Sequence, residues 1–82
     1  MGTRQRPGPE KLPEKLRIVR ERLGLSQNEI VEALGEKGEM FRSTISAFER
    51  GTREPSLLIL LRYARLIGVS TDILIDDEMD LR

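Results

Sequence analysis

The chain has 82 residues with 14 basic and 14 acidic side chains, and it contains no cysteine and no histidine. Their absence excludes disulfides, zinc sites built on these ligands, cysteine nucleophiles and histidine general bases. A single domain of this size buries only about 60% of the surface that its unfolded chain exposes. No apolar run approaches the roughly 20 residues that cross a bilayer, and the first dozen residues lack the apolar core of a secretory signal. The sequence therefore predicts a small, soluble, cytoplasmic protein.

Charge is distributed unevenly along the chain, although its sum is zero. Residues 1–25 carry seven Lys or Arg and three Glu, whereas from Asp72 onward there are five acidic residues and one arginine. A protein with this polarity can present one basic face to a nucleic acid. Residues 1–11 hold Arg4 and Arg6 between glycines and prolines without any periodicity, and are expected to be a flexible basic arm.

The first two expected helices carry clear local signals. Residues 12–23 have apolar side chains at the i, i+4, i+7 and i+11 positions of one face, and Pro13 suits the first helical turn. Ser26 is followed three residues later by Glu29, which is the spacing of a capping box at the start of a helix. This second helix is short and is expected to end at Gly35.

The third expected helix, residues 42–50 ("RSTISAFER"), has only three apolar side chains, Ile45, Ala47 and Phe48. Ile45 and Phe48 are three residues apart and are expected to face the core, which leaves hydroxyl and guanidinium groups on the remaining surface. Gly51 is expected to end this helix.

Two further helices complete the predicted fold. The fourth follows Ser56 as N-cap and is apolar on most faces, and a short fifth helix follows Ser70 or Thr71. Five short helices without any alternating strand pattern predict a compact all-α domain. The expected organisation is a basic arm at residues 1–11, a domain at residues 12–76 and an acidic tail at residues 77–82.

The order of these segments resembles the lambda-repressor-like helix-turn-helix family of phage repressors, Cro proteins and XRE-type regulators. The matching segments are "LGLSQNEIVEALG", "STISAFERGTREPS" and "IGVSTDIL", which occur together and in order over about residues 12–75. The resemblance implies that the third helix enters the major groove of DNA. It implies a sequence-specific transcriptional regulator that binds double-stranded DNA as a homodimer, with no cofactor, no metal and no membrane partner.

The resemblance also implies a role for individual residues. Arg42 can bind guanine through two parallel hydrogen bonds, which is worth about 1–3 kcal/mol of discrimination. The residues expected to face base edges are Arg42, Ser43, Thr44, Ser46 and Ala47. Those expected to contact DNA phosphates are Ser26, Gln27, Arg50, Thr52 and Arg53. Ser26 is equally well explained as an N-cap alone. For Arg53, a surface ion pair with Glu54 is the less favoured alternative.

Other positions are expected to support the fold or the dimer. Arg20 and Glu49 match a family ion pair that holds the third helix in place, so Glu49 is not counted as a DNA ligand. The turn before that helix is longer than in the family and contains Lys37, which could reach the DNA backbone, and Phe41 stands where a Ser or Thr N-cap is usual. The candidate dimer contacts are Leu57, Leu58, Ile73 and Ile75, of which Leu57 and Ile73 are explained equally well as core residues.

Two other classes of function remain as alternatives. The zero net charge, together with Glu36 and Glu39 in the long turn, would suit a protein-interaction or antitoxin-like module that uses the same fold. An enzyme is disfavoured, because no pair of acid and base or activated nucleophile can be assembled from these residue types. The acidic residues after Ile75 lack the spacing of a calcium loop and are expected to be a solvated tail.

Overall fold

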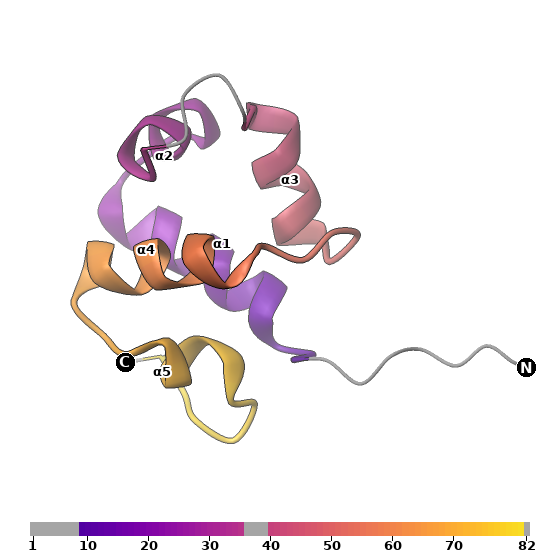
Figure 1. The fold of residues 1–82 in the computed structure, drawn as a ribbon, viewed down its shortest axis with the longest axis vertical. Helices are drawn as coiled ribbons and strands as arrows, with labels where there is room; N and C mark the ends of the chain where they lie inside the picture. Colours follow the sequence, from indigo (N-terminus) through magenta and orange to yellow (C-terminus); the bar gives the residue numbers. More distant parts are fainter. Residues whose placement is uncertain (1–8, 36–39, 82) are drawn as a thin grey trace, which may run out of the picture.

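The computed structural model describes residues 9–35 and 40–81, which contain five α-helices (Figure 1). Most of the predicted basic arm and the turn residues Glu36, Lys37 and Glu39 lie outside the described residues. Figure 1 shows α2 and α3 at one end of the domain and α5 at the other. The described residues contain no strand, as the sequence predicts. The helices are α1 (Leu12–Leu23), α2 (Gln27–Ala33), α3 (Arg42–Arg50), α4 (Leu57–Ile67) and α5 (Thr71–Ile75).

Serine side chains begin α2 and α4 as the sequence predicts. Ser26 Oγ accepts a hydrogen bond from the backbone N–H of Glu29 at 3.0 Å, and Glu29 Oε1 accepts one from the Ser26 N–H at 2.8 Å. At α4, Ser56 Oγ accepts from the N–H of Ile59 at 3.2 Å. These bonds satisfy N–H groups that have no partner within the helix. Ser70 is the N-cap of α5.

The end of α3 lies tightly against the start of α1. Gly51 has a left-handed backbone conformation with φ of 79°. A Cβ atom at this position would lie 3.1 Å from Cγ of Pro13. Any side chain here would therefore be strained in its backbone and crowded against α1. The turn at Gly51 lets the N–H of Thr52 donate back to the carbonyl of Ala47 at 3.0 Å.

Buried apolar side chains from all five helices form a single core. Within α3, Ile45 is fully buried and Phe48 is 4% exposed, which confirms that these two residues anchor the helix. Burying a side chain of this size contributes about 1.5–3 kcal/mol. The two anchors therefore determine which face of α3 is left to solvent. The core residues are Leu12, Leu16, Val19, Ile30, Leu34, Met40, Ile45, Phe48, Ile59, Leu60, Tyr63, Ala64 and Leu74.

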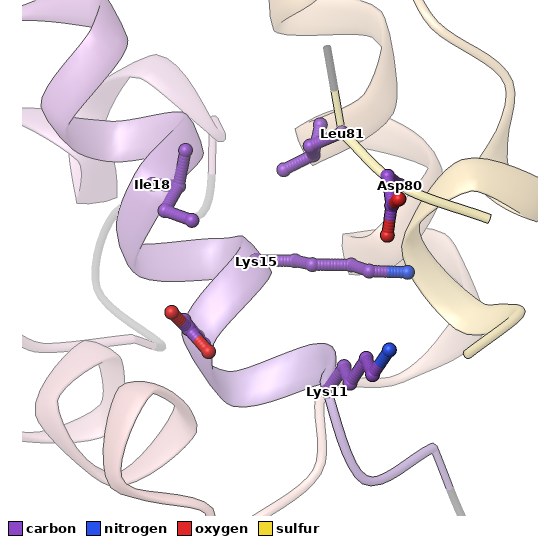
Figure 2. Close-up of a pocket in the computed structure, with 6 residues that line it drawn as sticks. Lys11, Lys15, Ile18, Asp80 and Leu81 are labelled. Atoms are coloured by element: carbon purple, nitrogen blue, oxygen red, sulfur yellow. The ribbon is translucent and has the colours of Figure 1, made fainter. Parts of the chain in front are cut away.

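Lys15 of α1 is a buried charged residue that the sequence analysis did not single out. Its side chain is directed from α1 toward the C-terminal segment (Figure 2). Nζ donates hydrogen bonds to the carbonyls of Ile73 at 2.8 Å, Asp76 at 2.9 Å and Met79 at 2.7 Å. The last carbonyls of a helix have no partner within it. Lys15 therefore closes the end of α5 and the turn that follows.

Asp77 forms a second link between the C-terminal segment and α1. Its carboxylate accepts hydrogen bonds from the backbone N–H groups of Glu10 at 2.9 Å and Lys11 at 3.0 Å. The bond from Lys11, followed by that from Glu10, lowers the pKa of Asp77 below its ordinary value. The carboxylate of Asp77 in the expected acidic tail is therefore bound to the folded domain by N–H groups at the start of α1. Leu81 also packs against the core, so the folded unit continues beyond residue 76.

Candidate nucleic-acid interface

The exposed face of α3 borders an open groove that it shares with the start of α2. Ile45 and Phe48 hold the opposite face of α3 in the core. As a result Arg42 and Ser43 are exposed, and Ser46 is half-buried one turn further along the helix. The groove is lined by Gln27, Asn28, Phe41, Arg42, Ser43, Ser46 and Arg50.

This groove is basic, although the net charge of the chain is zero. Among the residues that the structure describes, its lining contains the guanidinium groups of Arg42 and Arg50 and no carboxylate. The Nε of Arg50 donates to the carbonyl of Ser46 at 3.3 Å, which holds the arginine stem along α3. The other lining groups are hydroxyls, side-chain amides and one aromatic ring. Cations beside neutral hydrogen-bonding groups suit a polyanion whose bases are to be recognised.

Two of the five residues expected to read bases do not line this groove. Thr44 lines a separate hollow with Met40 and Phe48, and its Oγ1 accepts from the N–H of Phe41 at 3.3 Å. Its hydroxyl is therefore engaged in the start of α3. Ala47 is half-buried and is not among the lining residues. The reason is helical geometry, since each residue is rotated by about 100° from the last.

The start of α2 contributes one wall of the groove. The hydroxyl of Ser26 accepts the capping hydrogen bond from Glu29, and Ser26 does not line the groove. Gln27 does line the groove, and its Nε2 donates to Glu49 Oε1 at 3.4 Å. Sequence reasoning supplied no structural partner for Gln27, whereas the structure provides one across 22 residues of chain. The amide is thus oriented by a carboxylate from α3.

Arg20 and Glu49 form an ion pair between α1 and α3. Nε and Nη2 of Arg20 donate to the two carboxylate oxygens at 2.7 and 3.0 Å, and Nη1 donates to the carbonyl of Leu25 at 3.0 Å. The side chains are 17% and 6% exposed, respectively. The bonds to Glu49 raise the pKa of Arg20 above its ordinary value. The charge of the nearly buried Glu49 carboxylate is consequently balanced by the guanidinium of Arg20 from α1.

Tyr63 of α4 lies close enough to this ion pair to interact with it electrostatically. Burial, and then the charge of Glu49, raise the pKa of Tyr63 above its ordinary value. Its hydroxyl is buried and finds no hydrogen-bond partner among the described residues. The phenol therefore remains neutral beneath the pair.

The turn after α3 carries the remaining residues expected to contact phosphates. Thr52 Oγ1 donates to the carbonyl of Ala47 at 3.3 Å. Arg53 and Glu54 are both exposed, and no ion pair joins these two described residues. The surface ion pair between Arg53 and Glu54 is therefore not formed in this structure, and the guanidinium of Arg53 is exposed to solvent.

Sequence reasoning did not assign Asn28 and Phe41 to the site. Asn28 follows Gln27 in the first turn of α2, and this adjacency was the available signal. Phe41 is the N-cap of α3 and is 61% exposed. The sequence shows that Phe41 stands where a capping side chain is usual. Its position in the groove, however, depends on how α2 and α3 pack together.

A family model described as helix-turn-helix matches residues 16–74 of the chain. The chain belongs to the lambda-repressor-like helix-turn-helix family. Members of this family are DNA-binding transcriptional regulators and not enzymes, so the chain is a DNA-binding transcriptional regulator. The helix-turn-helix resemblance and the all-α fold predicted from the sequence are thereby confirmed.

Individual relatives of this helix-turn-helix domain agree with the family match. A Methanothermobacter thermautotrophicus protein named "Uncharacterized HTH-type transcriptional regulator" is 42% identical over 65 residues, which are 77% of this chain and 88% of the relative. The P22 c2 repressor bound to a synthetic operator has a TM-score of 0.68 and 26% identity, covering 80% of this chain and 94% of the repressor. The SinR–SinI complex contains a chain with a TM-score of 0.68 and 25% identity, covering 82% and 62%, respectively.

The four candidate dimer residues differ in exposure on this helix-turn-helix domain. Leu57 is 81% exposed, Leu58 is 52% exposed and Ile75 is 40% exposed. Ile73 is half-buried, and its carbonyl accepts from Lys15. Leu57 is therefore not a core residue, contrary to one of its two sequence interpretations.

Within residues 9–35 and 40–81 of the helix-turn-helix domain, no helix has the length and apolarity needed to cross a membrane. Nor do these ranges contain three or more acidic, histidine or cysteine side chains grouped as a metal site.

Proposed function

We propose that this regulator recognises a specific operator by inserting α3 into the major groove of DNA. Arg42, Ser43 and Ser46 read base edges in this arrangement. The observation that supports the proposal is the groove on α3, which combines two arginines with hydroxyl and amide groups and, within residues 9–35 and 40–81, is lined by no carboxylate. A helix fits the major groove, and the base edges there carry a distinct pattern of donors and acceptors.

The flanking turns hold the phosphate backbone in this proposal. Gln27 binds one phosphate beside the free N–H groups at the start of α2, with Ser26 as its neighbour. The hydrogen bond from Gln27 to Glu49 supports this role, because it orients the amide at the edge of the groove. On the other side the phosphate contacts come from Arg50, Thr52 and Arg53.

The experiment begins with selection of bound sites from a random DNA pool. Affinity is then measured by mobility shift on the selected duplex and on a scrambled duplex at two salt concentrations. Arg42→Ala should weaken selected-site binding by about 5- to 150-fold and scrambled-site binding much less. Arg53→Ala should weaken both and reduce the salt dependence. Arg65→Ala removes the same charge from an exposed position on α4 outside the groove, and serves as the control.

Equal losses for Arg42→Ala on the selected and scrambled sites would reject base reading by α3. A selected consensus without any half-site repeat would reject two-fold binding. Binding that does not fall with salt would reject the phosphate contacts, since counterion release makes DNA affinity salt-dependent.

The proposed regulator acts as a homodimer on half-sites about one helical turn apart, because one recognition helix reads only a few base pairs. The large exposure of Leu57 and Leu58 supports a contact at the start of α4, with Ile75 and Ile73 as further candidates. Leu57→Glu should lower the sedimentation coefficient of the free protein and abolish cooperative binding to the two half-sites. Met79→Glu changes another exposed apolar residue and serves as the control.

A protein partner is the second candidate function. It is supported by the structural similarity to the SinR chain, which was solved together with SinI. A chain that works only through a protein partner should select no DNA consensus, and its affinity for random duplex should be unaffected by Arg42→Ala. Selection of a consensus whose recognition depends on Arg42 would reject this candidate as the main function.

A further inference from the structure

Phe41 is an exposed aromatic residue in an otherwise polar groove. It is the N-cap of α3, with an extended backbone at φ −125° and ψ 169°, and the residue is 61% exposed. The ring lines the groove together with Asn28 from α2 and with Arg42 and Ser43 from α3. Phe41 therefore stands directly before the first residues of the exposed face of α3.

Neither helix capping nor core packing accounts for a phenylalanine at this position. The preferred N-cap residues are Ser, Thr, Asp and Asn, whose oxygen accepts from the first N–H groups of the helix. A phenyl ring has no such acceptor. Only the opposite half of a capping box is present, in which the N–H of Phe41 donates to Thr44 Oγ1 at 3.3 Å. Because the ring is largely exposed, its burial contributes little to the free energy of folding. A residue that breaks a local rule without any gain in stability points to a function in binding.

We propose that the ring of Phe41 recognises a thymine through its C5 methyl group, next to the base bound by Arg42. This inference rests on the proposed function, in which α3 enters the major groove. The thymine methyl is the apolar group that this groove of DNA presents, and phenylalanine is one of the side chains that contact it. The contact would remove both the methyl and the ring from water. Phe41 thus determines specificity at one position of each half-site.

The alternative is that the ring of Phe41 contacts a deoxyribose of the DNA backbone. Such a contact carries no sequence information. The two contacts differ in one measurable respect. Replacing thymine by uracil removes the C5 methyl and leaves base pairing and the sugar-phosphate backbone unchanged. A methyl contact is sensitive to this replacement, whereas a sugar contact is not.

The test uses the full chain and the operator selected from random DNA. Each thymine of a half-site is replaced in turn by uracil, and affinity is measured for the unmodified protein, Phe41→Ala, Phe41→Leu and the control Met79→Ala. At one position the unmodified protein should lose about fourfold in affinity, which corresponds to one buried methyl group. Phe41→Ala should bind the thymine and uracil duplexes equally at this position, and Phe41→Leu should retain part of the difference. Met79→Ala should behave like the unmodified protein.

Several outcomes overturn the inference alone. One is a uracil effect that persists unchanged in Phe41→Ala, and another is the absence of any uracil effect in a protein that does select an operator. A third is a uniform loss for Phe41→Ala on selected and scrambled duplexes, which would indicate a sugar contact. Failure to select any operator overturns the proposed function as well. Circular dichroism of Phe41→Ala, whose side chain is exposed, shows that the variant is folded in each measurement.

Discussion

The ion pair between Arg20 and Glu49 leads to a quantitative prediction about stability. Glu49→Gln preserves the shape of the side chain but removes its charge. The carboxylate accepts two hydrogen bonds from Arg20, at 2.7 and 3.0 Å, and one from Gln27 at 3.4 Å. After the substitution the guanidinium of Arg20, which is only 17% exposed, has no opposing charge in this pair. The ion pair that joins α1 to α3 is then lost, and the free energy of unfolding should fall.

The magnitude follows from the burial of the pair. Breaking a buried ion pair by removing one partner costs about 3–5 kcal/mol. The lower end applies here, because Arg20 is partly exposed and keeps its hydrogen bond to the carbonyl of Leu25. A loss of about 3 kcal/mol lowers the melting temperature of a domain of this size by roughly 12–24 °C.

The chain offers a matched control in Arg17 and Glu21. These residues form an i,i+4 pair at 3.5 Å with side chains 48% and 54% exposed. Such a pair contributes about 0.3–0.5 kcal/mol, so Glu21→Gln should lower the melting temperature by less than about 4 °C. Urea denaturation and thermal melting followed by circular dichroism measure both variants. Equal shifts for Glu49→Gln and Glu21→Gln would refute the reasoning.

Three further predictions concern residues outside the groove. Lys15→Met leaves three carbonyls without their donor and should cost at least about 2 kcal/mol in urea denaturation, whereas Lys11→Met at an exposed position should stay within about 0.5 kcal/mol. Because the pKa of Asp77 is lowered in the folded state, its carboxylate stabilises the fold above about pH 4 and loses this effect as the pH falls through the lowered pKa. The difference in unfolding free energy between the unmodified protein and Asp77→Asn should accordingly be present at pH 7 and close at acidic pH; a constant difference would contradict the assignment. Tyr63→Phe removes a buried hydroxyl without a partner among the described residues, so the free energy of unfolding should be unchanged or rise by up to about 1 kcal/mol.

Local signals made most of the fold predictable. The capping box at Ser26 and Glu29 marks the start of α2, and the glycine at position 51 marks the end of α3. Each of these signals depends on bonds between residues only a few positions apart, which the order of residues displays directly. The apolar pair Ile45 and Phe48 also identified the buried face of α3.

The candidate site was predictable only in part. Arg42, Ser43 and Ser46 line the groove, as their spacing opposite the buried pair indicates. Thr44 does not, because the roll of α3 about its axis is set by the helices that bury Ile45 and Phe48. The pairing of Arg20 with Glu49 was implied by the family resemblance and not by the two residues themselves.

The sequence by itself determined the order of the five helices and several of their caps, that they form an all-α helix-turn-helix domain, and which face of α3 is polar. Tertiary structure alone decided that Lys15 closes the end of α5, that Asp77 binds the N–H groups before α1, and that Gln27 is oriented by Glu49. The physical reason is distance along the chain. Capping and helical periodicity act over about four residues. The contacts of Lys15 and Asp77 join groups separated by 58 to 67 residues, which no local pattern records.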